Sequence, residues 1–243
     1  MMKITLKDKK LEAQDIWSFI FTKPGGLTFQ AGQFLQLFVP HDNPDDRGIK
    51  RFFTVAASPT EDFLMITTKI IKQSSSFKRE LFDSAIGTTF EAVEPTGPFV
   101  LPQDFIPCVL IAGGIGVTPY RSMAKLAADK KLPTPLKLVY ANKTPRETAY
   151  FDFFQELEKQ NPNFKVFYTM TEKDLSKIKW EGRAGRIDEA LIKEVAGELD
   201  KNLYYISGPQ PMVDAYKELL SQTAIKEDLI RLDYFPGYEA EKI

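Results

Sequence analysis

Cysteine and histidine are almost absent from this sequence, with one residue of each type among 243. A single cysteine, Cys108, excludes a disulfide within the chain and an iron–sulfur cluster whose cysteine ligands all come from it. A single histidine, His41, excludes a haem held between two histidines. We therefore expect no metal site and assign His41 no role. Cys108 lies in an apolar run, so we expect a small core residue rather than a reactive thiol.

Long apolar runs and a large net charge are also missing. No run approaches the ~20 apolar residues that span a bilayer, so we expect no membrane span. The N-terminal segment MMKITLKDKKLEAQD is charged and lacks the apolar core of a secretory signal, so we expect a cytoplasmic protein. A formal net charge of −1 gives no bulk attraction to nucleic acid or to an anionic membrane, and we expect neither as a partner.

Residues 1–102 are predicted to form an antiparallel β-barrel. Turn signals such as Lys23–Gly26 separate short apolar segments, and several short strands in series indicate a closed or nearly closed barrel. One helix is expected at Ser76–Ser84. The expected strands include Phe34–Val39, Phe52–Ala57, Phe63–Ile71 and Thr89–Val93. The segment Glu94–Pro102 is rich in proline and glycine and marks the domain boundary.

Residues 103–243 are predicted to form a second, α/β domain. Strand-like apolar runs alternate here with segments of helical spacing, which indicates a doubly wound parallel sheet. The expected strands are Val109–Ala112, Leu136–Ala141, Lys165–Thr169, Leu203–Ser207 and Ile230–Phe235, and the expected helices are Tyr120–Asp129, Arg146–Gln160, Ile187–Ala196 and Pro211–Gln222. Phe151, Phe154 and Leu157 recur at helical spacing and are expected in the core.

Ligands of such sheets bind beyond the carboxyl ends of the strands. Three loops with suitable chemistry leave those ends: Gly113–Pro119, Asn142–Arg146 and Ser207–Pro211. In the first, an apolar strand runs into Gly113, Gly114 and Gly116, and Pro119 suits the start of a helix. Free N–H groups at that helix N-terminus can bind an anion such as a dinucleotide pyrophosphate. The pattern is not G-x-G-x-x-G, so an ordinary strand–turn–helix corner stays open on this motif alone.

The segment Arg51–Pro59 combines an arginine at a strand start with alternating aromatic and hydroxyl side chains. An arginine there can clamp a phosphate through two parallel hydrogen bonds, and its neighbours can stack on a planar ring and bond its edge. Ser74–Ser76 precedes the expected helix, which offers a second N-terminus to a phosphate. A solvated edge-strand arginine and a simple serine N-cap explain the same residues without a ligand.

Five motifs together resemble the ferredoxin–NADP⁺ reductase superfamily, in order and over nearly the whole chain. Arg51-Phe52-Phe53-Thr54 resembles its flavin signature Arg-x-Tyr-Ser/Thr, Gly113–Pro119 its nicotinamide-dinucleotide signature, Tyr140–Thr144 its adenosine-side segment, Ser207–Met212 its Cys-Gly-Pro-x-x-Met motif, and Phe235–Tyr238 a common C-terminal ending. The resemblance implies an FAD-binding barrel at 1–102 followed by an NAD(P)-binding α/β domain at 103–243.

The same resemblance implies the flavin contacts. Arg51 would bind a flavin phosphate, Phe53 would pack on the isoalloxazine ring, and Thr54 would bond near flavin N5. Asp233 and Phe235 would approach the flavin from the last strand. The further flavin contacts that it implies are Phe52, Thr67, Thr68, Lys69, Ser74, Ser75 and Ser76.

The nucleotide contacts follow in the same way. Those implied near the pyrophosphate and nicotinamide are Gly113, Gly114, Thr118, Pro119, Gly208, Pro209 and Met212, and those on the adenosine side are Asn142, Lys143 and Arg146. The chain departs from the family pattern twice. Phe53 replaces a tyrosine and loses its hydroxyl contact, and Ser207 replaces a cysteine but can still donate a hydrogen bond. Thr54, Ser207 and Phe235 are the contacts expected at the reacting atoms.

The implied activity is that of an NAD(P)H-dependent flavoprotein reductase. A hydride would move between NAD(P)H and bound FAD, with FMN the less favoured flavin, and electrons would pass to a separate ferredoxin, flavodoxin or oxygenase component. Because the flavin supplies the chemistry and the protein positions the reactants, we expect no side-chain general base. Lys143 and Arg146 could pair with a ribose 2′-phosphate, which slightly favours NADPH, but as solvated loop charges they leave NADH open.

Two other functions are considered. The chain could be a flavin-binding electron-transfer subunit that is active only within a larger complex. It could also be a flavin-free nucleotide sensor, but Arg51, Thr54 and the serine run at Ser74–Ser76 argue against a sensor, because a sensor has no use for an intact flavin site.

Overall fold

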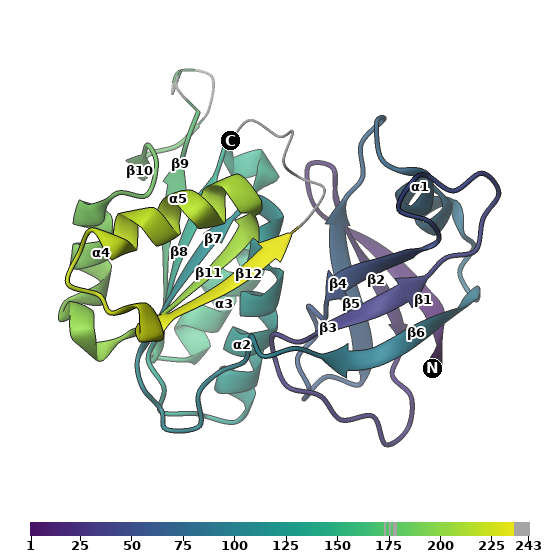
Figure 1. Cartoon of the computed structure of the whole chain (residues 1–243), viewed down its shortest axis with the longest axis horizontal. Coiled ribbons are helices and arrows are strands. Elements are labelled where there is room, and N and C mark those ends of the chain that lie inside the picture. The colour runs from purple at the N-terminus through teal and green to yellow at the C-terminus, as the bar shows by residue number, and fades with distance from the viewer. Residues whose placement is uncertain (173, 175, 177–178, 236–243) are drawn as a thin grey trace.

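The structure is a computed structural model that describes residues 1–172, 174, 176 and 179–235. Within these residues the chain forms two six-stranded sheets that lie side by side (Figure 1). The segment 236–238, which completes the expected C-terminal ending, lies outside the described residues. No helix in the described ranges is long and apolar enough to cross a membrane.

The first sheet is the predicted antiparallel barrel. Its strands are β1 (Met2–Ala13), β2 (Ile16–Thr22), β3 (Phe34–Phe38), β4 (Lys50–Thr54), β5 (Phe63–Lys69) and β6 (Thr89–Thr96), in the order β4-β3-β6-β1-β2-β5. After β4, the Ala56 N–H donates to the Met65 carbonyl of β5 at 2.7 Å, so the two edges meet and the barrel is nearly closed. Helix α1 (Ser76–Asp83) buries Phe77 and Leu81 against the barrel core.

The second sheet is the predicted doubly wound parallel sheet. Its strands are β7 (Cys108–Gly113), β8 (Leu136–Asn142), β9 (Phe164–Met170), β10 (Arg183–Ala184), β11 (Leu203–Pro209) and β12 (Ile230–Phe235), in the order β10-β9-β8-β7-β11-β12. Strands β8, β9 and β10 lie on one side of β7, and β11 and β12 lie on the other, so the strand order reverses between β7 and β11. That gap is the switch point at which such sheets bind ligands.

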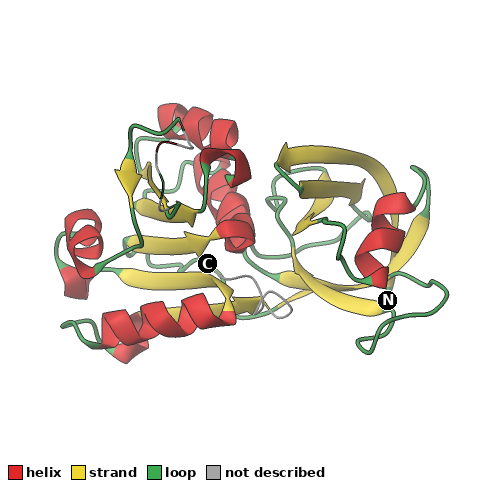
Figure 2. Cartoon of the chain, turned by 90° about the horizontal axis from the view of Figure 1, so that it is seen from above, coloured by secondary structure: helices red, strands yellow, loops and turns green. Residues whose placement is uncertain are grey.

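Among the described residues, helices α2 (Thr118–Asp129) and α3 (Phe151–Gln160) cover one face of the parallel sheet and α4 (Glu189–Ala196) and α5 (Gln210–Ser221) the other (Figures 1 and 2). Helices α2 and α3 share one buried cluster with β7 and β8. Helices α4 and α5 share another with the opposite faces of β7 and β11. Short 3₁₀ turns lie at Gly114–Val117 (η1), Pro145–Glu147 (η2), Leu199–Lys201 (η4) and Glu227–Leu229 (η5). Phe154 and Leu157 are buried as expected, and Phe151 packs on Tyr168 at the cluster's edge.

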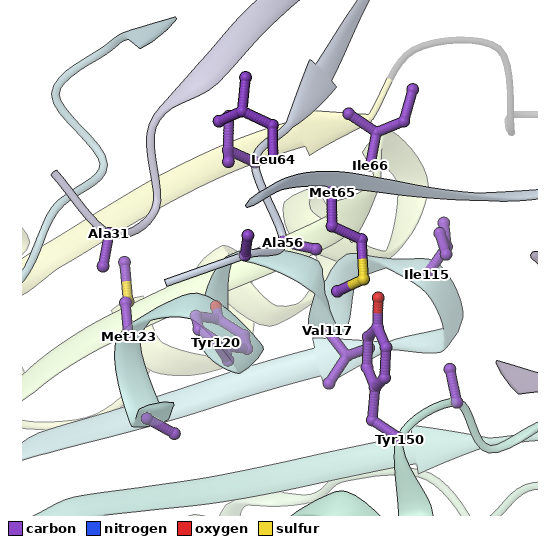
Figure 3. Close-up of a cluster of buried hydrophobic side chains, with 14 of the residues drawn as sticks. Ala31, Ala56, Leu64, Met65, Ile66, Ile115, Val117, Tyr120, Met123 and Tyr150 are labelled. Carbon is purple, nitrogen blue, oxygen red and sulfur yellow. The ribbon is translucent and has the colours of Figure 1, made fainter. Parts of the chain in front are cut away.

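One apolar cluster runs without a break from the barrel into the α/β layer. It brings together Ala31, Ala56, Leu64, Met65 and Ile66 of the barrel with Ile115, Val117, Tyr120, Met123 and Tyr150 of the second sheet and its helices (Figure 3). Because this contact is packed like a core, apolar side chains hold the parallel sheet against the barrel.

Several expected elements have different bounds in the structure, and two of these differences have a clear physical cause. The helix expected over Arg146–Gln160 begins only at Phe151, since Tyr150 has a left-handed backbone (φ 60°) that no right-handed helix accommodates. The strand expected over Phe52–Ala57 ends at Thr54, because the chain then leaves β3 and turns toward β5.

Candidate flavin and nucleotide site

A cavity of about 390 Å³ opens between the barrel and the parallel sheet, and most of the predicted flavin contacts line it. Its wall comes from β4, β5, the segment before α1, the turn η1 and the end of β12. The predicted residues at this wall are Arg51, Phe52, Phe53, Thr54, Thr67, Thr68, Lys69, Ser74, Ser75, Asp233 and Phe235. Segments from both ends of the chain therefore face one space.

Aromatic rings form part of the cavity wall. Phe34 and Phe52 meet edge to face, with ring centroids 5.5 Å apart. The Phe52 side chain is 60% exposed, which leaves apolar surface uncovered by the protein. Phe53 packs at a tilt on Phe77 of α1, with centroids 5.8 Å apart. Such rings suit a flat, partly apolar ligand.

Positive charge also gathers at this wall. Among the described residues that line the cavity, the cationic ones are Arg47, Arg51, Lys69 and Lys78, and the acidic one is Asp233. Ser75 is the N-cap of α1 and accepts a hydrogen bond from the backbone N–H of Lys78 at 3.3 Å. Cations beside serines and a helix N-terminus provide the donors that a phosphate group requires.

The protein holds Arg51 in place from one side. The Nη1 atom donates to the carbonyl oxygens of Arg47, Gly48 and Lys50, each at 2.8 Å. The Nη2 atom forms an ion pair with Asp45. Burial acts to raise the pKa of the Asp45 carboxyl, but the hydrogen bonds from Arg51 and Arg47 and the charges of these two arginines together outweigh burial, so the pKa lies below its ordinary value. The guanidinium is thus fixed at the cavity before any ligand arrives.

Ser76 does not line the cavity, unlike the two serines before it. Its hydroxyl oxygen accepts from the backbone N–H of Asp45 at 3.1 Å and lies 3.0 Å from Nε2 of His41. The other ring nitrogen of His41 lies 2.8 Å from the Val39 carbonyl. Ser76 and the single histidine therefore tie the 39–50 loop to α1, a structural role that the sequence did not indicate.

The glycines of the Gly113–Gly116 turn serve two purposes. A Cβ on Gly116 would lie 2.1 Å from the Ser207 carbonyl oxygen, and a Cβ on Gly113 would lie 2.1 Å from the sulfur of Met212. These two glycines let η1 pack on β11 and α5. Gly114 instead needs a left-handed backbone (φ 50°), and a Cβ there would meet open space at the sheet edge.

The other residues that the resemblance implies near the pyrophosphate and nicotinamide are buried. Thr118 and Pro119 are buried, and the Thr118 hydroxyl donates to the Ile115 carbonyl at 3.2 Å. Gly208 and Pro209 end β11, and Met212 lies buried in the first turn of α5. These residues surround the switch point between β7 and β11, but of the glycine turn only Gly114 is half-exposed.

The adenosine-side residues lie at the carboxyl end of β8. Asn142 is 5% exposed, and its side-chain nitrogen has no hydrogen-bond partner among the described residues. A buried donor without a partner is costly, so it marks a position where a ligand can bind. Lys143 is exposed, and its Nζ atom lies 3.9 Å from Oε2 of Glu172. Arg146 is also exposed, and its backbone carbonyl accepts a hydrogen bond from the Gln14 N–H at 2.8 Å.

Ser207 and Asp233 connect the two halves of the site. The Ser207 side chain is fully buried and its hydroxyl donates to Asp233 Oδ2 at 3.1 Å. Asp233 lines the cavity, so Ser207 reaches it through this carboxyl group. Burial raises the pKa of Asp233 to about 6, and the hydrogen bond from Ser207 opposes that rise.

The cavity also contains residues that the sequence motifs did not single out. They are Phe34, Arg47, Ile71, Gln73, Lys78, Ile115 and Tyr234. Lys78 could have been predicted from the sequence, because a cation in the first helical turn after a serine N-cap can reach a bound anion. Arg47 and Phe34 carried none, since their place at the wall depends on how the 39–50 loop and β3 fold around β4.

Comparisons with known proteins agree with this geometry. Residues 110–218 match the family model of the oxidoreductase NAD-binding domain. A flavohemoprotein of a Burkholderia species is 29% identical over 232 residues, which cover 93% of this chain and 57% of that protein. The glycine betaine monooxygenase reductase subunit of Chromohalobacter salexigens is 25% identical over 217 residues, which cover 86% of this chain and 57% of the relative. The chain thus spans less than two thirds of the length of these relatives.

Solved structures share the fold. The Amycolatopsis cytochrome P450 reductase GcoB superposes with a TM-score of 0.82 at 23% identity, covering 96% of this chain and 70% of that one. The flavohem-like FAD/NAD-binding domain of nitric oxide dioxygenase from Vibrio cholerae gives a TM-score of 0.81 at 17% identity, covering 96% of this chain and 98% of that one.

An antiparallel barrel and a doubly wound parallel sheet, with a cavity lined by residues of both, define the two-domain fold class of this chain. The motifs, the fold and the match of residues 110–218 to the NAD-binding domain are consistent with the ferredoxin–NADP⁺ reductase superfamily. The resemblance inferred from the sequence is confirmed.

Proposed function

We propose that the chain is a flavin-dependent oxidoreductase that moves a hydride between NAD(P)H and a bound FAD and passes electrons to a separate acceptor protein. One observation carries the proposal: the cavity is lined both by Thr54 of the barrel and by Ile115 of the turn η1 and Asp233 and Phe235 of β12. A flavin bound there would lie next to the switch point, where a dinucleotide binds in sheets of this kind.

The residues present fit a flavin. Arg51, Lys69 and Lys78 gather beside the serines of α1 and suit its phosphates. Phe53 and Thr54 offer a ring and a hydroxyl at the same wall. We propose FAD rather than FMN, since a flavohemoglobin from Malassezia yamatoensis with the same fold has been solved with bound FAD.

The flavin, when bound, supplies the ability to accept a hydride and release electrons. The chain's own residues would orient the reactants. Thr54, 8% exposed, would donate a hydrogen bond to the ring edge, and Phe235 would exclude water from it. Ser207 would act through Asp233, holding that carboxyl group at the cavity wall. No step in this scheme requires a side chain to remove a proton.

The nucleotide would bind along the carboxyl edge of the parallel sheet. Gly114 would allow close approach of the pyrophosphate, and Asn142 would use its unpartnered nitrogen toward the adenosine half. Thr118, Pro119, Gly208, Pro209 and Met212 would shape the floor beneath it. The Lys143 ammonium lies 3.9 Å from the Glu172 carboxylate, so its charge does not by itself select a 2′-phosphate. We therefore propose either NADH or NADPH as the donor.

We place the division between the flavin and nucleotide domains at residues 102 and 103, within the link between β6 and β7. The acceptor would be another protein. This is supported by relatives named as reductase components of oxygenases, including the propane 2-monooxygenase reductase of Mycolicibacterium smegmatis, 26% identical over 220 residues. Use of NAD(P)H supports a cytoplasmic site of action.

The test is stopped-flow absorbance at the oxidised-flavin band, with the purified, FAD-loaded protein mixed with NADH and separately with NADPH. We expect rapid bleaching, faster with one nucleotide than the other. Flavin-free protein is the matched control and should oxidise neither nucleotide. A protein that cannot be loaded with flavin would refute the proposal. A flavin-loaded protein that bleaches with neither nucleotide would favour the electron-transfer subunit instead.

A further inference from the structure

Helix α2 is fastened to the barrel by a buried arginine. Arg121 Nη1 donates to the Ala56 carbonyl at 2.8 Å and to Glu61 Oε2 at 2.8 Å, and Nη2 donates to Glu61 Oε1 at 3.0 Å. The side chains of Arg121 and Glu61 are 9% and 12% exposed. The guanidinium therefore forms a bidentate ion pair that is largely buried and crosses the contact between the barrel and the α/β domain.

A tyrosine makes a second polar contact across the same interface. Tyr150, at the start of α3, hydrogen-bonds through its hydroxyl to the Thr67 hydroxyl of β5, and Ser18 lies 3.5 Å away. Figure 3 shows Tyr150 pointing from the α/β layer toward Met65 and Ile66. The Arg121 guanidinium lies over the ring of Tyr150, 5.6 Å from its centroid. We call Arg121, Glu61, Tyr150 and Thr67 the interface clasp.

The residues of the interface clasp lie next to the two surfaces that the reaction must align, the flavin wall of the barrel and the nucleotide edge of the parallel sheet. Ala56 follows Thr54 by two residues, and Thr67 itself lines the cavity. On the other side, Arg121 lies one helical turn after Thr118, the first residue of α2, which continues directly from the glycine turn η1. A hydrogen-bonded path of a few residues thus joins the flavin wall to the nucleotide edge.

Stability alone is a weak explanation for these groups. The desolvation of a buried ion pair offsets most of its attraction, and apolar residues of similar size often stabilise a protein as well. A fully hydrogen-bonded pair instead fixes one geometry. That matters here, because a misplacement of about 1 Å between reacting groups can slow a reaction by about 100-fold.

We infer that the interface clasp positions the parallel sheet against the barrel for hydride transfer, with Arg121 and Tyr150 as its positioning residues. The inference rests on the proposed function. It assigns no contact with either cofactor to these two residues. They act by setting the distance between the nicotinamide and the flavin ring.

The test uses three variants of the FAD-loaded full chain. Tyr150→Phe removes one hydroxyl and keeps the ring. The double variant R121Q/E61Q removes both charges, so neither partner remains as an unpaired buried ion. Asp129→Asn is the matched control, since Asp129 accepts from the Thr60 hydroxyl at 2.5 Å and joins the far end of α2 to the same barrel loop, away from both walls.

For each variant, stopped-flow absorbance gives the limiting rate of flavin bleaching at saturating nucleotide, the nucleotide dissociation constant and the long-wavelength charge-transfer absorbance that stacked rings produce. We expect the double variant to lose about 10-fold or more in the limiting rate and most of the charge-transfer absorbance, with flavin and nucleotide affinities within about twofold of the wild type. Tyr150→Phe should show a smaller loss of the same kind, and Asp129→Asn none.

A purely structural clasp would behave differently. The double variant would then unfold at lower urea concentration, yet bleach at the wild-type limiting rate with an unchanged charge-transfer band. That outcome overturns the inference while the wild type still bleaches. Failure of the wild type itself to bleach would instead contradict the proposed function, so the two failures are distinguishable. If the double variant does not fold, the limiting rate of Tyr150→Phe decides between the outcomes.

Discussion

Ser207 and Asp233 are register partners on the neighbouring parallel strands β11 and β12, and the serine hydroxyl donates to the carboxylate at 3.1 Å. The serine is fully buried behind the carboxyl group, which lines the cavity. Burial raises the pKa of Asp233 to about 6, so this group changes charge at the cavity wall in mildly acidic solution.

The first prediction concerns stability against pH. The pKa of Asp233 is higher in the folded than in the unfolded chain, so its protonation stabilises the fold below the unfolded value of 3.8, and that stabilisation is lost as the pH rises to about 6. Asp233→Asn keeps an acceptor for Ser207 but cannot ionise. We expect its free energy of unfolding to exceed that of the wild type by about 3 kcal/mol at neutral pH and to match it near pH 4.

Urea unfolding from pH 4 to pH 8 measures this difference. Ser207→Ala is the informative companion, because loss of the donated hydrogen bond should raise the pKa of Asp233 further and move the transition to higher pH. Parallel pH profiles for the wild type and Asp233→Asn would contradict the assignment.

The second prediction concerns Arg51. Arg51→Met removes the guanidinium that faces the cavity and leaves Asp45 without its ion-pair partner. Since a charge-assisted hydrogen bond contributes about 1.5–3 kcal/mol, we expect FAD affinity to fall by roughly 10- to 100-fold. Titration of flavin-free protein with FAD, followed by flavin fluorescence, measures the change.

Lys50→Met is the matched control for Arg51→Met. Lys50 is the preceding residue of β4, carries the same charge, is exposed and does not line the cavity. Its FAD affinity should stay within about twofold of the wild type. Equal losses in the two variants would show that general surface charge, rather than the held guanidinium, binds the flavin.

The third prediction concerns the glycine turn. A Cβ on Gly116 would lie 2.1 Å from the Ser207 carbonyl oxygen, so Gly116→Ala must push η1 away from β11. We expect a loss of about 1–3 kcal/mol in the free energy of unfolding, measured by urea titration. Gly25→Ala, at a glycine with open space around it, should change it by no more than about 0.5 kcal/mol. Equal free energies of unfolding for Gly116→Ala and the wild type would contradict the prediction and show that the turn can shift away from β11 without cost.

The fourth prediction concerns the single cysteine. Burial raises the pKa of the Cys108 thiol to about 12, and the nearby Asp104 adds to the rise. The native protein should therefore resist a thiol reagent at pH 8 and react with one equivalent only after urea unfolding, since the thiolate is the reactive form. Rapid labelling of the folded chain would show that β7 opens readily.

The order of the elements was predictable because it depends on local patterns. The apolar run before Gly113 and the alternation of strands and helices after residue 103 indicated the parallel sheet, and β12 begins and ends as expected at Ile230 and Phe235. The flavin motif at Arg51–Thr54 likewise pointed to residues that line the cavity.

The rest depended on contacts between distant segments, which no local pattern encodes. Ser76 was predicted with Ser74 and Ser75 at a phosphate, and no local pattern indicated that its hydroxyl also bonds the 39–50 loop. Thr118 was predicted to meet the nucleotide, and no local pattern indicated that its side chain is buried. Arg47 lies at the cavity wall, in a loop that is held by hydrogen bonds to Ser76 and Arg51.

The sequence by itself determined the two kinds of sheet, their order and the family motifs, since hydrophobic period, glycine turns and proline positions act over a few residues. Only the tertiary structure decided that Thr54 and Asp233 face one cavity, that Ser207 donates a hydrogen bond to Asp233, and that Arg121 forms an ion pair with Glu61 across the interface. These contacts join residues that are far apart in the sequence, and they exist because the two sheets pack into one core.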